Sequence, residues 1–84
     1  MSWQVRWQST ARRDIARLDP QIQERVLVAV QRLATTGMGD VLRLTGVEPP
    51  EWRLRVGQWR VRFRRNTAEQ ILDILRVLPR DQAY

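Results

Sequence analysis

The side chains that could carry chemistry in this sequence are almost all arginines. Its 84 residues include 15 Lys and Arg against 9 Asp and Glu, a formal net charge of +6, and all 15 are arginine. Histidine, cysteine and lysine are absent. This excludes a Ser–His–Asp triad, a thiolate nucleophile, Cys or His metal ligands and a Schiff-base lysine. What remains is acid–base chemistry by carboxylates or by the single tyrosine, Tyr84, beside guanidinium groups that stay charged.

Residues 52–64 hold the densest group of these arginines, in alternation with apolar residues around a central Gly-Gln pair. A period of two predicts two strands, and glycine in the first turn position predicts a two-residue hairpin turn between them. This register sets Arg55 opposite Arg60 and Arg53 opposite Arg62. One face of the hairpin is then apolar, and the other carries only arginine.

Facing arginines are destabilising by up to about 1 kcal/mol per pair, so this arrangement has no evident benefit for folding alone. A solvated sheet face is the alternative, although such a face more often includes Glu or Thr. We therefore interpret the arginine side of the hairpin as a surface that binds a polyanion, either RNA or DNA. Arginine can hold a phosphate group in a bidentate way, which lysine cannot.

Four tryptophans, Trp3, Trp7, Trp52 and Trp59, offer a second way to bind nucleic acid, because exposed rings stack on bases. Each of them alternates in phase with an aliphatic or aromatic neighbour. This phasing favours packing in the core beneath the helices.

The N-terminal half of the chain predicts one strand and two helices. Residues 3–7 alternate, as in a half-buried strand. A helix capped by Ser9 or Thr10 follows. Asp19-Pro20 ends that helix and begins a second one, which runs to about Ala34.

The C-terminal half predicts three strands. Residues 38–51 are interpreted as a loop, held to the core by Leu42 and Leu44. The hairpin follows, and residues 71–78 form a strand that is apolar on both faces and therefore central. The order of strand, helix, helix and three strands predicts an α+β fold. We expect one domain over residues 1–84, with a small, largely antiparallel sheet and both N-terminal helices on one face.

No segment resembles a signal peptide or approaches the roughly 18 apolar residues of a membrane helix. We therefore expect a cytoplasmic protein that does not enter a membrane.

Several features together resemble one known family. They are the order of the elements, the Leu18-Asp19-Pro20 junction, the hairpin WRLRVGQWRVRF and the ending LRVLPRDQAY. Over essentially the whole chain they are similar to the RelE/ParE superfamily of bacterial toxins, most of all to its RelE branch. The resemblance implies a type II toxin–antitoxin system. RelE-like members enter the ribosomal A site and cleave mRNA there by attack of the 2′-hydroxyl on the adjacent phosphate, which stops translation and growth.

The resemblance assigns catalysis to Arg60, Arg80 and Tyr84, with no metal ion or cofactor. Arg60 and Arg80 suit the negative charge of the phosphorane. Tyr84 is the candidate for accepting the 2′ proton, because arginine barely deprotonates.

By the same resemblance Arg53 and Arg55 are RNA-binding residues, and Arg62, which the predicted register places on the same side of the hairpin, is assigned with them. The proton acceptor remains open between the terminal tyrosine and a carboxylate such as Asp81 or Glu51.

Two other functions are compatible with the sequence. One is a ParE-like toxin that binds DNA gyrase and cleaves nothing, and the other is a basic nucleic-acid-binding module without toxicity. The short junction at Asp19-Pro20 and the pattern of Arg60, Arg80 and Tyr84 favour the metal-independent endoribonuclease. Expected partners are mRNA, the ribosome and an acidic or partly disordered antitoxin segment that covers the arginines.

Overall fold

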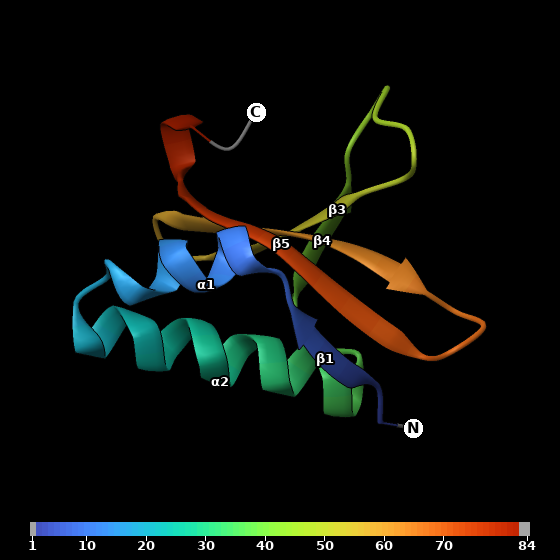
Figure 1. Cartoon of the computed structure of the whole chain (residues 1–84), viewed down its shortest axis with the longest axis horizontal. Helices are drawn as coiled ribbons and strands as arrows, with labels where there is room; N and C mark the ends of the chain where they lie inside the picture. The colour runs from blue at the N-terminus through green and yellow to red at the C-terminus, as the bar shows by residue number, and fades with distance from the viewer. Residues whose placement is uncertain (1, 83–84) are drawn as a thin grey trace.

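The computed structural model describes residues 2–82, which form a five-stranded sheet and two α-helices (Figure 1). The elements in chain order are β1 (Gln4–Trp7), α1 (Ser9–Ala16), α2 (Pro20–Thr36), β2 (Asp40–Arg43), β3 (Trp52–Val56), β4 (Trp59–Asn66), β5 (Ile71–Pro79) and the 3-10 helix η1 (Arg80–Gln82). The strand order is β1-β5-β4-β3-β2, and every pair except the parallel β1–β5 pair is antiparallel. The predicted α+β fold is confirmed.

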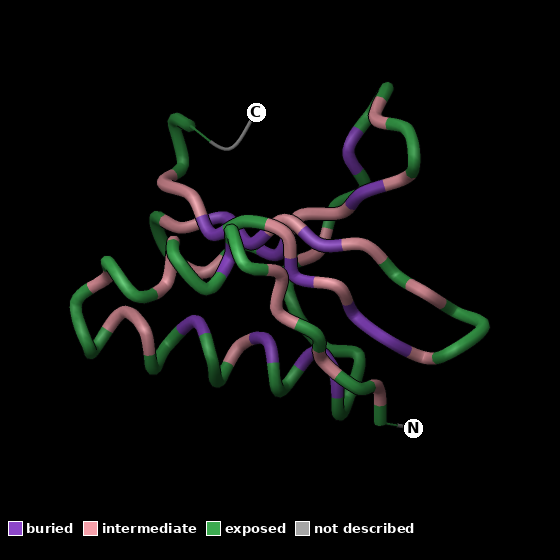
Figure 2. The backbone as a smooth tube through the Cα atoms, in the orientation of Figure 1, coloured by how far each residue is buried: buried purple, intermediate pink, exposed green. Residues whose placement is uncertain are grey.

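The core lies between α2 and one face of the sheet. Buried segments alternate with exposed ones along α2, and others lie in the strands above it (Figure 2). Val26 and Val30 of α2 are buried in one cluster with Leu54, Val61 and Phe63 of the hairpin strands. All four tryptophans are partly buried against this core, as their phasing predicts. The tryptophan rings are therefore used in packing, and the arginines are the distinctive feature of the surface that residues 2–82 form.

Helix α2 has the start and stop that its sequence predicts. The carboxylate of Asp19 accepts a hydrogen bond of 2.9 Å from the Gln21 amide, and Pro20 takes the first helical position. The helix ends at Thr36 because Gly37 adopts a left-handed conformation, with φ of 76°. Neither helix within residues 2–82 has the length and apolar character needed to cross a membrane.

The predicted cap of α1 is wrong. The helix starts at Ser9 after Gln8, whose side chain makes no capping hydrogen bond. The hydroxyl of Thr10 donates instead to the carbonyl oxygen of Leu75 at 2.8 Å. Strand β1 pairs with β5 only as far as Ile74, so the rest of that edge of β5 is left without a strand partner, and α1 lies along it.

Asp14 of α1 completes the cover of this edge. Its Oδ2 accepts hydrogen bonds from the Val77 amide at 2.9 Å and from Nε of Arg76 at 2.8 Å. Partial burial alone would raise the pKa of Asp14, but the hydrogen bonds from Arg76 and Val77 outweigh it and lower the pKa below its ordinary value. One carboxylate thus joins α1 to both the backbone and a side chain of β5.

The interpretation of residues 38–51 as a continuous loop is wrong, because they contain β2. This four-residue edge strand pairs with β3 and has too few residues to show an alternating pattern. Leu44 is buried as expected, whereas Leu42 is 54% exposed and does not hold the segment to the core. Leu42 lies opposite Arg53, on the face of the sheet away from the helices.

Replacing Asp14 with alanine is expected to lower the free energy of unfolding by about 1–3 kcal/mol at pH 7, because the Val77 amide and Arg76 lose a shared acceptor. Urea-induced unfolding measures this loss. The control is Glu24→Ala, since Glu24 is exposed and its side chain makes no hydrogen bond within residues 2–82. Its free energy of unfolding should stay within about 0.5 kcal/mol of the wild type.

The loss should also depend on pH. Since the folded state lowers the pKa of Asp14, this carboxylate stabilises the fold above the ordinary carboxyl pKa of about 3.9. That contribution disappears as the pH falls through the lowered pKa. Wild type and Asp14→Ala should therefore converge in stability below about pH 4. A difference that persists unchanged in stronger acid would contradict a role for the charge.

Candidate nucleic-acid interface

The face of the sheet that points away from α2 is covered by arginine side chains. The hairpin register is the predicted one, with Arg55 opposite Arg60 and Arg53 opposite Arg62, and β5 adds Arg76 opposite Arg62. The β2–β3 loop and the C-terminal segment both project on this side of the sheet (Figure 1). We call this surface the arginine face, and its members are Arg53, Arg55, Arg60, Arg62, Arg64 and Arg76.

Two arginines of this face lie at its end nearest the β3–β4 turn, and the backbone of a third, Arg80, lies beside that turn. Arg55 and Arg60 face each other across the hairpin, and the Arg80 amide donates to the Gln58 carbonyl oxygen of the turn at 2.8 Å. We call Arg55, Arg60 and Arg80 the hairpin-end arginines. Within residues 2–82, no carboxylate lies within 4.0 Å of any of their guanidinium groups. None of the three therefore forms an ion pair within residues 2–82, although Asp40 lies opposite Arg55 across the β2–β3 pair.

Arg60 is the most buried of these three, with a relative exposure of 7%. Its Nη1 donates to the carbonyl oxygens of Gly57 at 2.9 Å and of Trp59 at 3.0 Å. These neutral acceptors orient the guanidinium group and leave it with its full charge. Arg60 is thus held rigidly by the turn, as a group must be if it is to stabilise charge without reorganising.

One row further from the turn, every arginine is paired with an acid. Arg53 Nη1 lies 3.2 Å from Oδ1 of Asp40, and Arg62 Nη2 lies 2.7 Å from Oε1 of Glu51. The third member of the row, Arg76, is held by Asp14 of α1. Each arginine of this middle row therefore has an acidic partner. The three acids come from β2, from the β2–β3 loop and from α1.

Glu51 has the most enclosed carboxylate of these acids, with a side chain 9% exposed. Besides Arg62, it contacts Arg64, whose Nη2 lies 3.4 Å from Oε2. A buried carboxylate is tolerated only where opposite charges and hydrogen bonds replace water, and the two guanidinium groups supply both. The Leu44 amide fixes the backbone of Glu51 through a 2.9 Å hydrogen bond to its carbonyl oxygen.

The end of the face furthest from the turn alternates in charge. Arg64 lies opposite Asp73, and Asp73 lies opposite Arg6 of β1. Arg6 binds Asp73 through Nε at 2.6 Å and Nη2 at 3.2 Å, and Gln8 adds a third hydrogen bond. The hydrogen bond from Arg6 is the main reason that the pKa of Asp73 is lowered. Positive charge on this surface is therefore concentrated toward the hairpin end.

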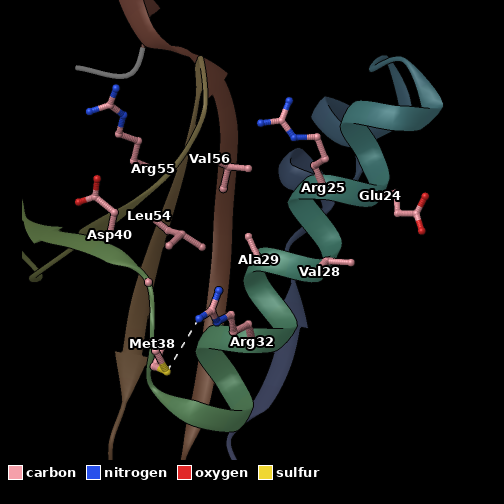
Figure 3. Close-up of a pocket in the computed structure, with 11 residues that line it drawn as sticks. Glu24, Arg25, Val28, Ala29, Arg32, Met38, Asp40, Leu54, Arg55 and Val56 are labelled. Atoms are coloured by element: carbon pink, nitrogen blue, oxygen red, sulfur yellow. Dashed lines mark hydrogen bonds between the residues drawn. The ribbon is translucent and has the colours of Figure 1, made fainter.

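A groove of about 510 Å³ lies on the other side of β3, between that strand and α2 (Figure 3). Arg25 and Arg32 extend from α2 along one wall, while Asp40 and Arg55 lie across from them. Arg55 thus stands at the border between this groove and the arginine face. Among residues 2–82, no group of three acidic side chains is arranged to hold a metal ion on either surface.

Comparison with known protein families gives one match, which spans residues 5–84. The matched family is described as the ParE toxin of type II toxin–antitoxin systems. The chain belongs to the RelE/ParE superfamily of toxins. A comparison with curated protein sequences gives no significant match.

Solved structures of RelE toxins share the fold of this RelE/ParE toxin. The RelBE2 toxin–antitoxin complex of Mycobacterium tuberculosis is 30% identical, with a TM-score of 0.76, over 95% of this chain and 100% of that one. The archaeal RelE–RelB complex of Pyrococcus horikoshii has a TM-score of 0.80 at 24% identity, over 99% and 100% of the two chains. The RelB–RelE complex of Methanococcus jannaschii has a TM-score of 0.75 at 19% identity, over 94% of each chain.

The structure brings most of the predicted site residues of this toxin onto one surface. Arg60 and Arg80 lie at the hairpin end, with Arg55 beside them. Arg53 and Arg62 lie on the same face but in ion pairs. The remaining predicted catalytic residue, Tyr84, lies outside the described residues.

The acids that divide the arginine face were missed in the sequence, although part of the signal was present. Glu51 falls in the alternating series of Arg53 and Arg55, so a strand begun one residue earlier would place it on their face. Asp73 likewise interrupts the apolar run of residues 71–75. Asp14 and Asp40 come from a helix and an edge strand whose positions depend on the complete sheet.

The turn that holds the hairpin-end arginines should depend on Gly57, whose φ is 58°. We expect Gly57→Ala to lower the free energy of unfolding by about 1–2 kcal/mol, because a left-handed conformation is strained for an L-residue. Gly57→Asn should lose less, since asparagine tolerates this conformation. If Gly57→Asn loses as much stability as Gly57→Ala or more, the cause is instead a steric clash with Arg25. Nη2 of Arg25 lies 3.0 Å from the position of an added Cβ. Denaturant unfolding of both variants decides between the two causes.

Proposed function

We propose that this toxin is an endoribonuclease that cleaves mRNA in the ribosomal A site and thereby stops translation. The observation that supports it best is the set of hairpin-end arginines. They combine positive charge that is unpaired within residues 2–82 with rigid placement of Arg60, in a chain of a toxin family. A trigonal-bipyramidal phosphorane needs this kind of positive, preorganised environment.

In the proposed reaction, the RNA supplies its own nucleophile. The 2′-hydroxyl attacks the adjacent phosphorus, and the bond to the 5′-oxygen of the next nucleotide breaks. That oxygen takes up a proton from water and leaves as a 5′-hydroxyl, and the other product is a 2′,3′-cyclic phosphate, which water can open to a 3′-phosphate. Arg60 and Arg80 stabilise the charge on the non-bridging oxygens. Binding alone holds the attacking and leaving oxygens in line, which accounts for a large part of such a rate enhancement.

The proton from the 2′-hydroxyl needs an acceptor, and Tyr84 is the group that we propose. It follows η1 by two residues, and η1 begins at Arg80 beside the turn. A phenol close to several guanidinium groups gives up its proton more readily, because positive charge favours the phenolate. Of the predicted RNA-binding residues, we propose Arg55 for the contact with the RNA backbone beside the cleaved bond, because Arg53 and Arg62 are already in ion pairs.

A cognate antitoxin is the second proposed partner. The similar RelE chains from Mycobacterium tuberculosis, Pyrococcus horikoshii and Methanococcus jannaschii are all described in complexes with antitoxins of the RelB type. For this chain we propose a partner with an acidic or partly disordered segment that covers the arginine face and excludes RNA in the cytoplasm. Opposite charge would favour rapid association.

Inhibition of DNA gyrase without RNA cleavage is the alternative function. The description of the matched family as the ParE toxin favours this alternative. The nuclease is supported by the hairpin-end arginines, because gyrase binding does not require a charge-stabilising site.

The test is to induce the toxin in cells and map mRNA 5′ ends across translated reading frames. Cuts in phase with codons are expected for the wild type. Arg80→Ala should lower the cleavage rate by about 100-fold or more, as the loss of a transition-state charge donor does. Tyr84→Phe should also lower it by about 100-fold or more. Arg13→Ala, at an exposed position of α1, is the matched control and should cut as the wild type does.

Other results would identify the alternatives. Growth arrest with DNA damage and intact mRNA would reject the nuclease in favour of gyrase inhibition. The absence of any growth arrest would leave a non-toxic nucleic-acid-binding module. Full cleavage by both Arg80→Ala and Tyr84→Phe would keep the nuclease but reject the assigned residues.

A further inference from the structure

The ion pairs of the arginine face do not extend to its hairpin end, although Asp40 lies opposite Arg55 across the β2–β3 pair. Asp40, Glu51 and Asp14 neutralise the middle row, and within residues 2–82 none of them forms an ion pair with Arg55, Arg60 or Arg80. These ion pairs separate the five arginines of the proposed site into a paired group, Arg53 and Arg62, and a group without an ion-pair partner among residues 2–82, Arg55, Arg60 and Arg80. Of the three arginines that the sequence predicts to bind RNA, only Arg55 belongs to the second group.

We propose that Glu51 and Asp40 are internal counter-ions that hold Arg62 and Arg53 away from RNA phosphates, so that the hairpin-end arginines make the phosphate contacts. This inference rests on the proposed RNA binding and assigns a role to two acids within that site. Glu51 and Asp40 act through the arginines that they hold and are therefore positioning residues.

Burial supports this role for Glu51. Its two oxygens engage Arg62 at 2.7 Å and Arg64 at 3.4 Å, while only 9% of its side chain meets solvent. The Nε atoms of Arg62 and Arg64 are buried without a hydrogen-bond partner among residues 2–82. The Arg62 guanidinium is therefore held against this carboxylate, which a phosphate would have to displace, whereas the Arg64 side chain is 42% exposed and is held less closely.

Asp40 holds Arg53 in a more open setting. Arg53 Nη1 donates to the Asp40 carbonyl oxygen at 3.1 Å and to its Oδ1 at 3.2 Å. The side chain of Arg53 is only 15% exposed, although that of Asp40 is 58% exposed. Arg53 is thus fixed against β2 by both the backbone and the side chain of one residue. Removal of the charge at Asp40 disturbs little packing, which makes it a clean second site for a test.

The physical consequence appears in the salt dependence of RNA binding. A phosphate that contacts a free guanidinium releases condensed counter-ions from the RNA, and each such contact contributes about 0.7 to the slope of log K against log salt for a single strand. An arginine already paired with a carboxylate carries no net charge to offer. The slope of log K against log salt therefore increases with the number of unpaired arginines that contact phosphate. The arginines held by Glu51 and Asp40 do not contribute to it.

The experiment measures binding of a single-stranded RNA whose 2′-hydroxyls are methylated, which prevents cleavage. Fluorescence anisotropy titrations between about 50 and 200 mM KCl give the slope. Asp40→Asn should steepen it by about 0.7, and Glu51→Gln by about 0.7 to 1.4, because one or both of its arginines become available. At 0.1 M salt, each freed arginine should tighten binding about fivefold.

The matched control is Glu24→Gln, which makes the same change in net charge on an exposed part of α2. Its slope should equal that of the wild type. Arg55→Gln should flatten the slope by about 0.7, whereas Arg53→Gln should leave it nearly unchanged. Circular dichroism checks that each variant is folded. If Glu51→Gln does not fold, the slope of Asp40→Asn alone tests the inference.

The outcomes separate this inference from the proposed function. A wild type that does not bind the free RNA would overturn the inference, while the proposed function would still be decided by the mapping of mRNA 5′ ends in cells. Binding by the wild type, with slopes for Asp40→Asn and Glu51→Gln equal to that of Glu24→Gln, would overturn the inference alone. Equal flattening by Arg53→Gln and Arg55→Gln would overturn it as well.

Discussion

The two-residue turn at Gly57 and Gln58 sets the register of β3 and β4, and the rest of the structure follows from that register. It places the apolar residues of both strands against α2 and stacks like charges on the opposite face. Facing arginines repel, so a stable sheet needs nearby acids or neutral acceptors. The acids of the middle row and the carbonyl oxygens around Arg60 provide them.

The second constraint is the open edge of β5. Strand β1 covers only the first half of it, and α1 covers the remainder with Thr10 and Asp14. The same Asp14 neutralises Arg76 of the arginine face. A contact that completes the sheet therefore also shapes the charge of the proposed binding surface, which couples the stability of the fold to the function of the site.

Charge on the arginine face increases from one end to the other. It alternates in sign around Asp73, is compensated in the middle row and, within residues 2–82, is unpaired at the hairpin end. Because of this gradient, the two ends of the arginine face differ in charge, whereas the ends of a uniformly basic surface would be equivalent. It also suits a protein without lysine or histidine, because a guanidinium can bind and stabilise phosphate but does not exchange protons near neutral pH.

The sequence by itself determined the α+β order, the limits of α2, the hairpin register and the arginine-only face. Each of these depends on local rules of alternation, capping and turn chemistry, which act over a few residues. The superfamily could also be identified from these residues, and the match over residues 5–84 confirms it. Only the tertiary structure decided that Asp40–Arg43 is a strand and that Thr10 serves β5 instead of capping α1. It alone decided which arginines are free, because the carboxylates of Asp14 and Glu51 reach their partners across 62 and at least 11 positions of the chain, a separation that no local pattern encodes.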